Sequence, residues 1–84
     1  MNWKERIVND PAILLGKPTI RGTRMSVEFI LECLASGWTE AMIFESYPHI
    51  TKDDLRAVFG YLRDVMETER FMPLPKSRYD LSGK

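Results

Sequence analysis

The sequence is short of the residues from which disulfide bonds and metal sites are built. Its 84 residues include one cysteine, Cys33, and one histidine, His49. A single cysteine cannot form an internal disulfide bond, and these two residues supply too few ligands for a Cys- or His-based metal site. Asp53 and Asp54 are poor joint ligands, because neighbours in a helix point in different directions. We therefore expect neither an enzyme nor a protein with a metal or cofactor.

Long apolar runs are also missing. No run approaches the length needed to span a bilayer, and the first residues, Met-Asn-Trp-Lys-Glu-Arg, lack the apolar region of a signal peptide. These absences predict a cytoplasmic protein without a membrane partner.

The length fits one domain, and a domain of this size is only marginally stable alone. Because 44% of the residues are hydrophobic, surplus apolar surface favours a homodimer.

The chain has no net charge, but its charges are unevenly distributed. Residues 1–24 carry five basic and two acidic side chains, a net charge of +3, so the remainder carries −3. A basic N-terminal segment can bind a polyanion, and it can equally dock onto the acidic body of a second copy. Charge alone does not choose between these two partners.

Three short runs that each contain apolar residues, separated by turn signals, occupy the first quarter of the chain. They cover residues 7–8, 12–15 and 19–21, and Asn-Asp-Pro and Gly-Lys-Pro interrupt them. The runs are too short for helices. We therefore expect short strands or extended loops there, with one small hairpin.

A helical period begins at Ser26. A first helix is predicted from Ser26, a good N-cap, to Gly37, which tolerates the left-handed conformation of a helix end. Its apolar residues share one face, and they are Val27, Ile30, Leu31, Leu34 and Trp38. Cys33 lies near this face, so we expect an inert buried thiol.

Two further helices are predicted after the first. One begins after Thr39 and ends at Tyr47, because Pro48 disfavours helical geometry in the residue before it. The other begins after Thr51, with Asp54 in the capping-box position where Glu or Gln is usual. It runs to about residue 70, and the residues of its predicted apolar face are Leu55, Val58, Phe59, Leu62, Val65 and Met66.

The pattern predicts a mainly α domain over residues 1–70, with three helices and a short N-terminal β element. Pro73 and Pro75 interrupt the chain beyond it, so residues 71–84 are expected to form a flexible tail. His49 falls in the turn between the second and third helices, where a capping or solvent-exposed role is expected.

The last two predicted helices and their short turn match a helix-turn-helix motif, although simple helix packing gives the same pattern. In a helical projection the basic residues of the third helix fall on one edge of the apolar face, and they are Lys52, Arg56, Arg63 and Arg70. Such an edge can meet DNA phosphates. The alternative is a solvated face with local salt bridges such as Arg63–Glu67. Gly60 weakens the helix by about 1 kcal/mol relative to Ala, and close approach of another backbone or a ligand would explain it.

The segment Gly-Lys-Pro-Thr-Ile-Arg-Gly-Thr-Arg, residues 16–24, is the most informative stretch of the chain. Its glycines permit turns with positive φ, and its proline imposes extended geometry on the preceding residue. We expect Ile20 to point inward and Thr19 and Arg21 to point outward. The segment lacks the P-loop signature. Two uses stay open: Lys17, Arg21 and Arg24 contact a nucleic-acid backbone, or the arginines pair with carboxylates of the same fold or a partner subunit.

From about Ile7 to Tyr61 the chain resembles the bacterial and archaeal family named domain of unknown function 433. Leu15 departs from the family pattern, since a glycine is common at that position. The resemblance is carried by Asp10-Pro11, Gly16-Lys17-Pro18, Ile20, Gly22-Thr23-Arg24, Val27, Ile30, Leu34, Gly37, Thr39, Ile43, Tyr47-Pro48, Ile50, Asp54-Leu55, Ala57 and Tyr61.

This resemblance implies a homeodomain-like helix-turn-helix fold that is often dimeric. It also implies a role, since members look like antitoxins of type II toxin–antitoxin pairs, beside a toxin with a PIN-like nuclease fold. The family pattern defines no catalytic residues, so none are carried over.

Two functional hypotheses follow from the residues and the resemblance together. The first is an antitoxin-like regulator that binds operator DNA as a dimer, with DNA contacts expected from Lys17, Arg21, Arg24, Lys52, Arg56 and Arg63. In this hypothesis the tail binds and neutralises the PIN-like toxin, with contacts expected from Phe71, Met72, Leu74, Lys76, Arg78 and Tyr79. The second is a homodimeric protein-interaction module that never touches DNA, which the acidic residues of the third helix and the zero net charge favour.

Overall fold

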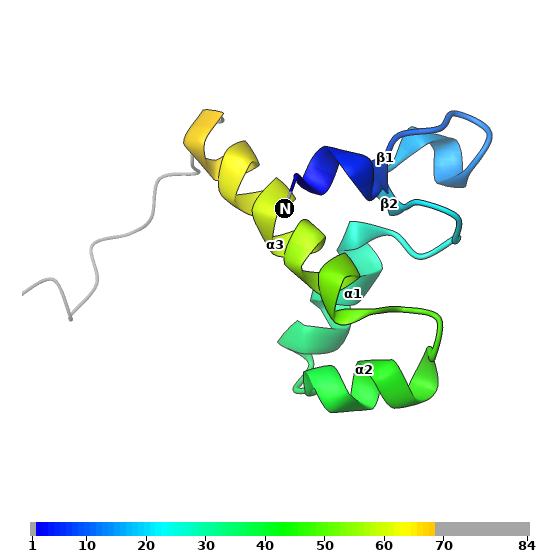
Figure 1. Ribbon diagram of the computed structural model, residues 1–84, viewed down its shortest axis with the longest axis vertical. Helices are drawn as coiled ribbons and strands as arrows, with labels where there is room; N and C mark the ends of the chain where they lie inside the picture. The colour runs from blue at the N-terminus through cyan, green and yellow to red at the C-terminus, as the bar shows by residue number, and fades with distance from the viewer. Residues whose placement is uncertain (1, 69–84) are drawn as a thin grey trace, which may run out of the picture.

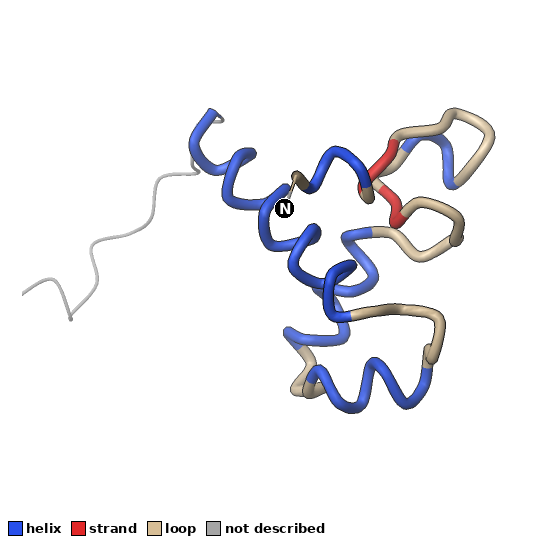
Figure 2. The backbone as a smooth tube through the Cα atoms, in the orientation of Figure 1, coloured by secondary structure: helices blue, strands red, loops and turns tan. Residues whose placement is uncertain are grey.

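A computed structural model describes residues 2–68 of the chain. Two short 3-10 helices, two strands and three α-helices follow one another (Figure 1). Their bounds are Trp3–Glu5 (η1), Ile7–Val8 (β1), Leu14–Gly16 (η2), Thr19–Ile20 (β2), Val27–Ala35 (α1), Glu40–Ser46 (α2) and Lys52–Thr68 (α3). The predicted class, mainly helical with a short N-terminal β element, is confirmed. Helices dominate the backbone of residues 2–68 in Figure 2, and the two strands lie side by side as a small pair.

The two strands form the predicted hairpin. They run antiparallel, with Ile7 opposite Ile20. The extended geometry expected for residues 12–15 is wrong over the second half of that run, where η2 forms. Asp10 explains the difference, because its carboxylate accepts a hydrogen bond from the Ala12 amide at 2.9 Å and its carbonyl accepts one from Ile13 at 2.8 Å. These bonds bend the chain after residue 10.

The predicted helix starts are confirmed by their side-chain caps. The Ser26 hydroxyl accepts a hydrogen bond from the Phe29 amide at 2.9 Å, and the Thr39 hydroxyl accepts one from Met42 at 3.2 Å. Each bond satisfies an amide that has no partner inside its helix. The first helix is followed by Gly37 at φ +99°, and the second ends before Pro48, both as expected.

The third helix begins one residue after its predicted cap, Thr51, and is described as far as Thr68. Its expected end near Arg70, and the whole segment 71–84 that we expect to be a tail, lie outside the described residues. Four of its buried positions, Asp54, Leu55, Ala57 and Val58, face the rest of the protein. Phe59 and Met66 were expected on this apolar face, but they are 43% and 56% exposed, so that expectation is wrong for both.

The core joins the hairpin to all three α-helices. The strand β2 and each of the three α-helices contribute one of the largest fully buried aliphatic side chains. They are Ile20 of β2, Ile30 of α1, Ile43 of α2 and Val58 of α3. Burying such a side chain contributes roughly 1.5–3 kcal/mol relative to leaving it exposed. The hairpin is therefore integrated into the helical core, and Cys33 is buried there as expected.

Candidate functional site

The most distinctive exposed surface of the described residues runs along α3. Its side chains are spaced four, three, four and three residues apart, which places them on one side of a helix. They are Lys52, Arg56, Phe59, Arg63 and Met66. We refer to these five residues as the α3 outer face. Basic and apolar groups alternate along it, so the face offers both charge and apolar contact.

The structure brings the basic residues of the α3 outer face together. A hollow of about 410 Å³ is lined by Arg56, Phe59, Gly60 and Arg63. A second hollow, of about 300 Å³, lies between α2 and the start of α3, and its lining residues are Glu40, Lys52, Leu55, Arg56 and Phe59. Arg56 and Phe59 border both hollows. Three of the four basic residues predicted on this edge, Lys52, Arg56 and Arg63, therefore form one continuous surface. The fourth, Arg70, lies outside the described residues.

Carboxylates lie beside two of these cations. Arg56 pairs with Asp53 at 3.5 Å, and Arg63 pairs with Asp64 at 3.4 Å. The partner of Arg63 is thus Asp64, whereas the sequence suggested Glu67. Both arginine side chains are at least 70% exposed, and exposed pairs of this kind contribute at most about 1 kcal/mol. A phosphate can displace either carboxylate at small cost.

Trp3 fixes η1 against the flank of α3. Its indole Nε1 donates a hydrogen bond of 2.6 Å to an Asp64 carboxylate oxygen. This bond, with a smaller contribution from the neighbouring Arg63, lowers the pKa of Asp64 below its ordinary value. A Cβ on Gly60 would lie 3.3 Å from Cδ1 of Trp3. The close approach expected at Gly60 is therefore made by an indole ring, and neither a second backbone nor a ligand is needed to explain this glycine.

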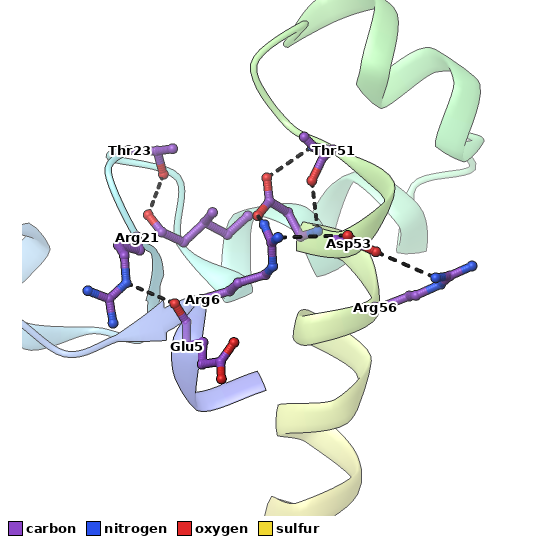
Figure 3. A network of polar contacts seen from close by, with 9 residues as sticks. Glu5, Arg6, Arg21, Thr23, Thr51, Asp53 and Arg56 are labelled. Atoms are coloured by element: carbon purple, nitrogen blue, oxygen red, sulfur yellow. Dashed lines mark hydrogen bonds and ion pairs between the residues drawn. The ribbon is translucent and has the colours of Figure 1, made fainter. Parts of the chain in front are cut away.

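The basic residues of the N-terminal segment lie elsewhere. Arg21 donates from Nε to the Glu5 carbonyl at 2.9 Å, and Lys17 pairs with Glu28 at 3.0 Å (Figure 3 for Arg21). Arg24 is exposed and forms no ion pair with another of residues 2–68. Arg21 thus bonds a backbone carbonyl, and not a carboxylate as one of the two open alternatives proposed.

Arg21 does not share the α3 outer face. With Glu5, Arg6 and Asp54 it lines a separate hollow of about 290 Å³. At about 100° per residue, Asp54 lies roughly 160° round the helix from Arg56. The structure therefore separates the predicted DNA-contacting residues: those of α3 share one exposed surface, whereas Lys17 and Arg21 line two other hollows.

Sequence reasoning missed Arg6, which joins the hairpin to the start of α3 (Figure 3). Its Nη1 donates to Asp54 Oδ1 at 3.0 Å, and Asp54 is only 7% exposed. The other Asp54 oxygen accepts the Thr51 amide at 3.0 Å, while the Thr51 hydroxyl accepts the Asp54 amide at 3.1 Å. This is a complete capping box. The Asp in the position where Glu or Gln is usual is the sequence signal that could have led to Arg6. Its buried carboxylate needs a basic partner.

The turn after β2 shapes the fold. Gly22 adopts φ +79°, and the Thr23 hydroxyl donates to the Ile20 carbonyl at 2.8 Å and accepts the Met25 amide at 2.9 Å. The outward orientation expected for Thr19 is wrong, because this side chain is buried and its hydroxyl donates to the Lys17 carbonyl at 2.6 Å. These bonds account for the threonines and a glycine of the segment without a ligand.

Other features of the described part of the chain bear on the chemistry. Among residues 2–68 no three His, Cys, Asp or Glu side chains gather as metal ligands. None of the helices described is both long and apolar enough to cross a membrane. His49 is exposed in the turn between α2 and α3, as expected. The residues expected to contact a toxin lie outside the described part, and they are Phe71, Met72, Leu74, Lys76, Arg78 and Tyr79.

The model of one protein family matches residues 7–62, more than half of the chain. Its description is protein of unknown function (DUF433). The chain therefore belongs to this family. No curated protein matches the chain, and no solved structure matches it.

Proposed function

We propose that this member of the DUF433 family is a homeodomain-like helix-turn-helix protein that binds operator DNA as a dimer and acts as the antitoxin of a type II toxin–antitoxin pair. The α3 outer face is the observation that carries the DNA-binding part of the proposal. It places three cations on the exposed side of the second helix of a helix pair, which is the position of a recognition helix.

In the proposed complex, α3 enters the major groove with its N-terminal end close to the bases. Lys52 and Arg56 then reach phosphates or guanine edges, and Arg63 meets the backbone further along. Phe59 lies between the two arginines in sequence, and an exposed ring there suits contact with a thymine methyl group. This accounts for a phenylalanine that is 43% exposed among charged neighbours.

The charge distribution also suits this orientation. The two acidic groups that pair with the face's arginines, Asp53 and Asp64, are also held by Arg6 and Trp3 respectively. When the arginines turn toward phosphates, both carboxylates keep a partner within the protein. The repulsion between these carboxylates and DNA is thereby reduced.

A gel shift with the DNA upstream of the chain's own coding sequence tests this part of the proposal. Each phosphate contact contributes roughly −0.9 to the slope of log K against log salt concentration. Three cations per protomer predict a slope of about −5 for a dimer. An absent shift, or one that salt does not weaken, would contradict operator binding.

The antitoxin part of the proposal is carried by the family resemblance and by residues 71–84, which lie outside the described part. Lys76 and Arg78 would neutralise the clustered carboxylates of a PIN-like nuclease, while the apolar residues of this segment anchor in grooves. Pull-down of the neighbouring gene product, in the cytoplasm where both are expected, tests it. Unchanged capture after deletion of 71–84 would contradict a toxin-binding tail.

A protein-interaction module without DNA binding is the second candidate. The exposed apolar groups Phe59 and Met66 favour it, because aromatic residues, methionine and arginine are enriched at protein interfaces. The salt dependence of binding separates the two candidates. A partner held by Phe59 and Met66 resists added salt, whereas DNA held by Lys52, Arg56 and Arg63 does not.

A further inference from the structure

The loop before β2 presents a leucine to solvent in an unfavourable backbone conformation. Leu15 is 92% exposed, more than any other large hydrophobic side chain among residues 2–68. It adopts φ +58° and Leu14 adopts φ +51°, and these are the two non-glycine residues of the described part with positive φ. Leucine is disfavoured in this region, where a glycine carries no penalty. An exposed leucine in this backbone conformation is unfavourable in two respects, so a function for its side chain would explain it.

This loop is fixed by hydrogen bonds on both sides of Leu15. The Gly16 amide donates to the Ile13 carbonyl at 3.1 Å, and the Lys17 amide donates to Leu14 at 3.1 Å. The Asn9 side chain donates to the Gly16 carbonyl at 2.9 Å. The leucine is thus held outward on a braced turn. Strained positions that the surrounding structure over-determines in this way are common at binding sites.

An apolar hollow lies just beyond this loop, between the segment that precedes β2, α1 and α3. Its volume is about 260 Å³, and its lining residues are Lys17, Pro18, Val27, Glu28, Leu31 and Tyr61. The volume falls below the roughly 300–1,000 Å³ of most small-molecule pockets, so a protein side chain suits it better than a cofactor. The Lys17–Glu28 ion pair belongs to the same site, with both side chains more than half exposed. An apolar floor with a charged rim is the anatomy of a protein interface.

We propose that two copies of the chain form a twofold dimer in which Leu15 of each protomer enters this hollow on the other. Lys17 and Pro18, which line the hollow, follow Leu15 by two and three residues. Their Cα atoms therefore lie within about 11 Å of the Leu15 Cα atom. A twofold axis passing beside Lys17 places the Leu15 of each protomer over the hollow of the other. Both protomers then use the same surface, so the assembly stops at a dimer. Leu15 does not fill its own hollow, as its exposure shows.

This inference deepens the proposed function, from which it takes the dimeric state. Tyr61 lines the hollow, and at about 100° per residue it lies roughly 160° round α3 from Arg63. A dimer built through the hollow therefore leaves the α3 outer face of both protomers free for DNA. Because the inserted group is apolar, assembly is expected to be insensitive to salt, in contrast to DNA binding.

Analytical ultracentrifugation of the full chain and its Leu15→Gly variant, without DNA, tests the proposal. The wild type is expected to dimerise, and the variant to raise the dimer dissociation constant at least about 100-fold, because two buried leucines are lost per dimer. The thermal stability of the monomeric variant should equal or exceed that of the wild-type monomer, since glycine fits φ +58° without strain. Met42→Ala, which truncates another exposed apolar side chain on α2, away from the residues that line the hollow, is the control and should leave the constant unchanged.

Disulfide trapping locates the contact independently of stability. In a Cys33→Ser background, one tagged chain carries Leu15→Cys and a second carries Leu31→Cys. Mild oxidation of the mixture should give mainly the mixed disulfide, which cannot form within a chain because each carries one thiol. A wild type that is monomeric up to about 100 µM, an unchanged constant for Leu15→Gly, or trapping without the mixed species would each overturn the proposal. DNA binding by Lys52 and Arg56 variants reads out the proposed function separately, so the failure of one is distinguishable from the failure of the other.

Discussion

Arg6 and Asp54 connect the N-terminal hairpin to the first turn of α3 through a 3.0 Å ion pair. Asp54 also completes the capping box with Thr51, so one buried carboxylate serves both the helix start and the docking of the hairpin. The two residues are 48 positions apart. This contact therefore joins the residue before β1 to the first turn of α3.

Replacing Arg6 by alanine should lower the free energy of unfolding by about 1–2 kcal/mol. The loss arises because Asp54 stays buried without its cation, and the figure is at the low end for such pairs because Arg6 is 38% exposed. Chemical denaturation of the full chain measures it. Arg24→Ala, at an exposed arginine without an ion pair to another of residues 2–68, is the matched control and should change stability by less than about 0.5 kcal/mol. Equal effects of the two variants would contradict the role of Arg6.

The Trp3–Asp64 hydrogen bond predicts a pH dependence at the acid end. The pKa of Asp64 is lowered in the folded protein, chiefly by the indole N–H. A lowered pKa contributes stability that is present above the unfolded value of about 3.9 and is lost as pH falls through the folded value. Trp3→Phe removes the donor and keeps an aromatic ring.

The carboxyl chemical shift of Asp64, followed by NMR between neutral and acidic pH, reports this pKa directly. In Trp3→Phe the midpoint should move upward, toward the ordinary value for aspartate. Lys4→Gln, which removes a more distant charge, should move it less, because Lys4 is the smallest of the causes. An unmoved midpoint in Trp3→Phe would show that the indole does not stabilise the ionised form.

Gly60→Ala should not raise the free energy of unfolding, although helix propensity alone predicts an increase. Alanine is favoured over glycine by about 1 kcal/mol inside a helix, but its Cβ would lie 3.3 Å from the Trp3 ring. We expect no gain, or a loss, in the wild-type background. In a Trp3→Ala background the same substitution should stabilise by about 1 kcal/mol. A double-mutant cycle by urea denaturation compares the two, and a gain of equal size in both backgrounds would exclude the indole contact.

Helix starts and ends were predictable from the sequence because they depend on neighbouring residues. Ser26, Thr39 and Thr51 each cap an amide three positions away, and Gly37 and Pro48 act on their own backbone or that of a neighbour. The hairpin is also local, because only the turn-rich residues 9–18 separate its strands. Local chemistry of this kind is visible in a single sequence.

The features that were not predictable depend on contacts between distant segments. Phe59 and Met66 fit the apolar period of α3, yet no other part of residues 2–68 covers them fully. The indole of Trp3 on Gly60 and the pairing of Arg6 with Asp54 each join positions more than 45 residues apart. The prediction that Thr19 points outward was wrong because its hydroxyl donates a hydrogen bond to the Lys17 carbonyl. This bond lowers the free-energy cost of burying a polar side chain. Periodicity reports which residues share a face, and it does not report what packs there.

Neutralising the α3 outer face should weaken DNA binding more than neutralising the N-terminal segment. Lys52→Gln and Arg56→Gln each remove a cation from the continuous face, and each should make the salt slope of a dimer shallower by about 2, one contact per protomer. Lys17→Gln removes a cation that pairs with Glu28 away from this face, and its slope should match the wild type. Fluorescence anisotropy with the upstream DNA at several salt concentrations gives all three slopes. If Lys17→Gln alters the slope as much as the α3 variants do, the DNA lies across both groups of cations, and the α3 outer face is only part of the binding surface.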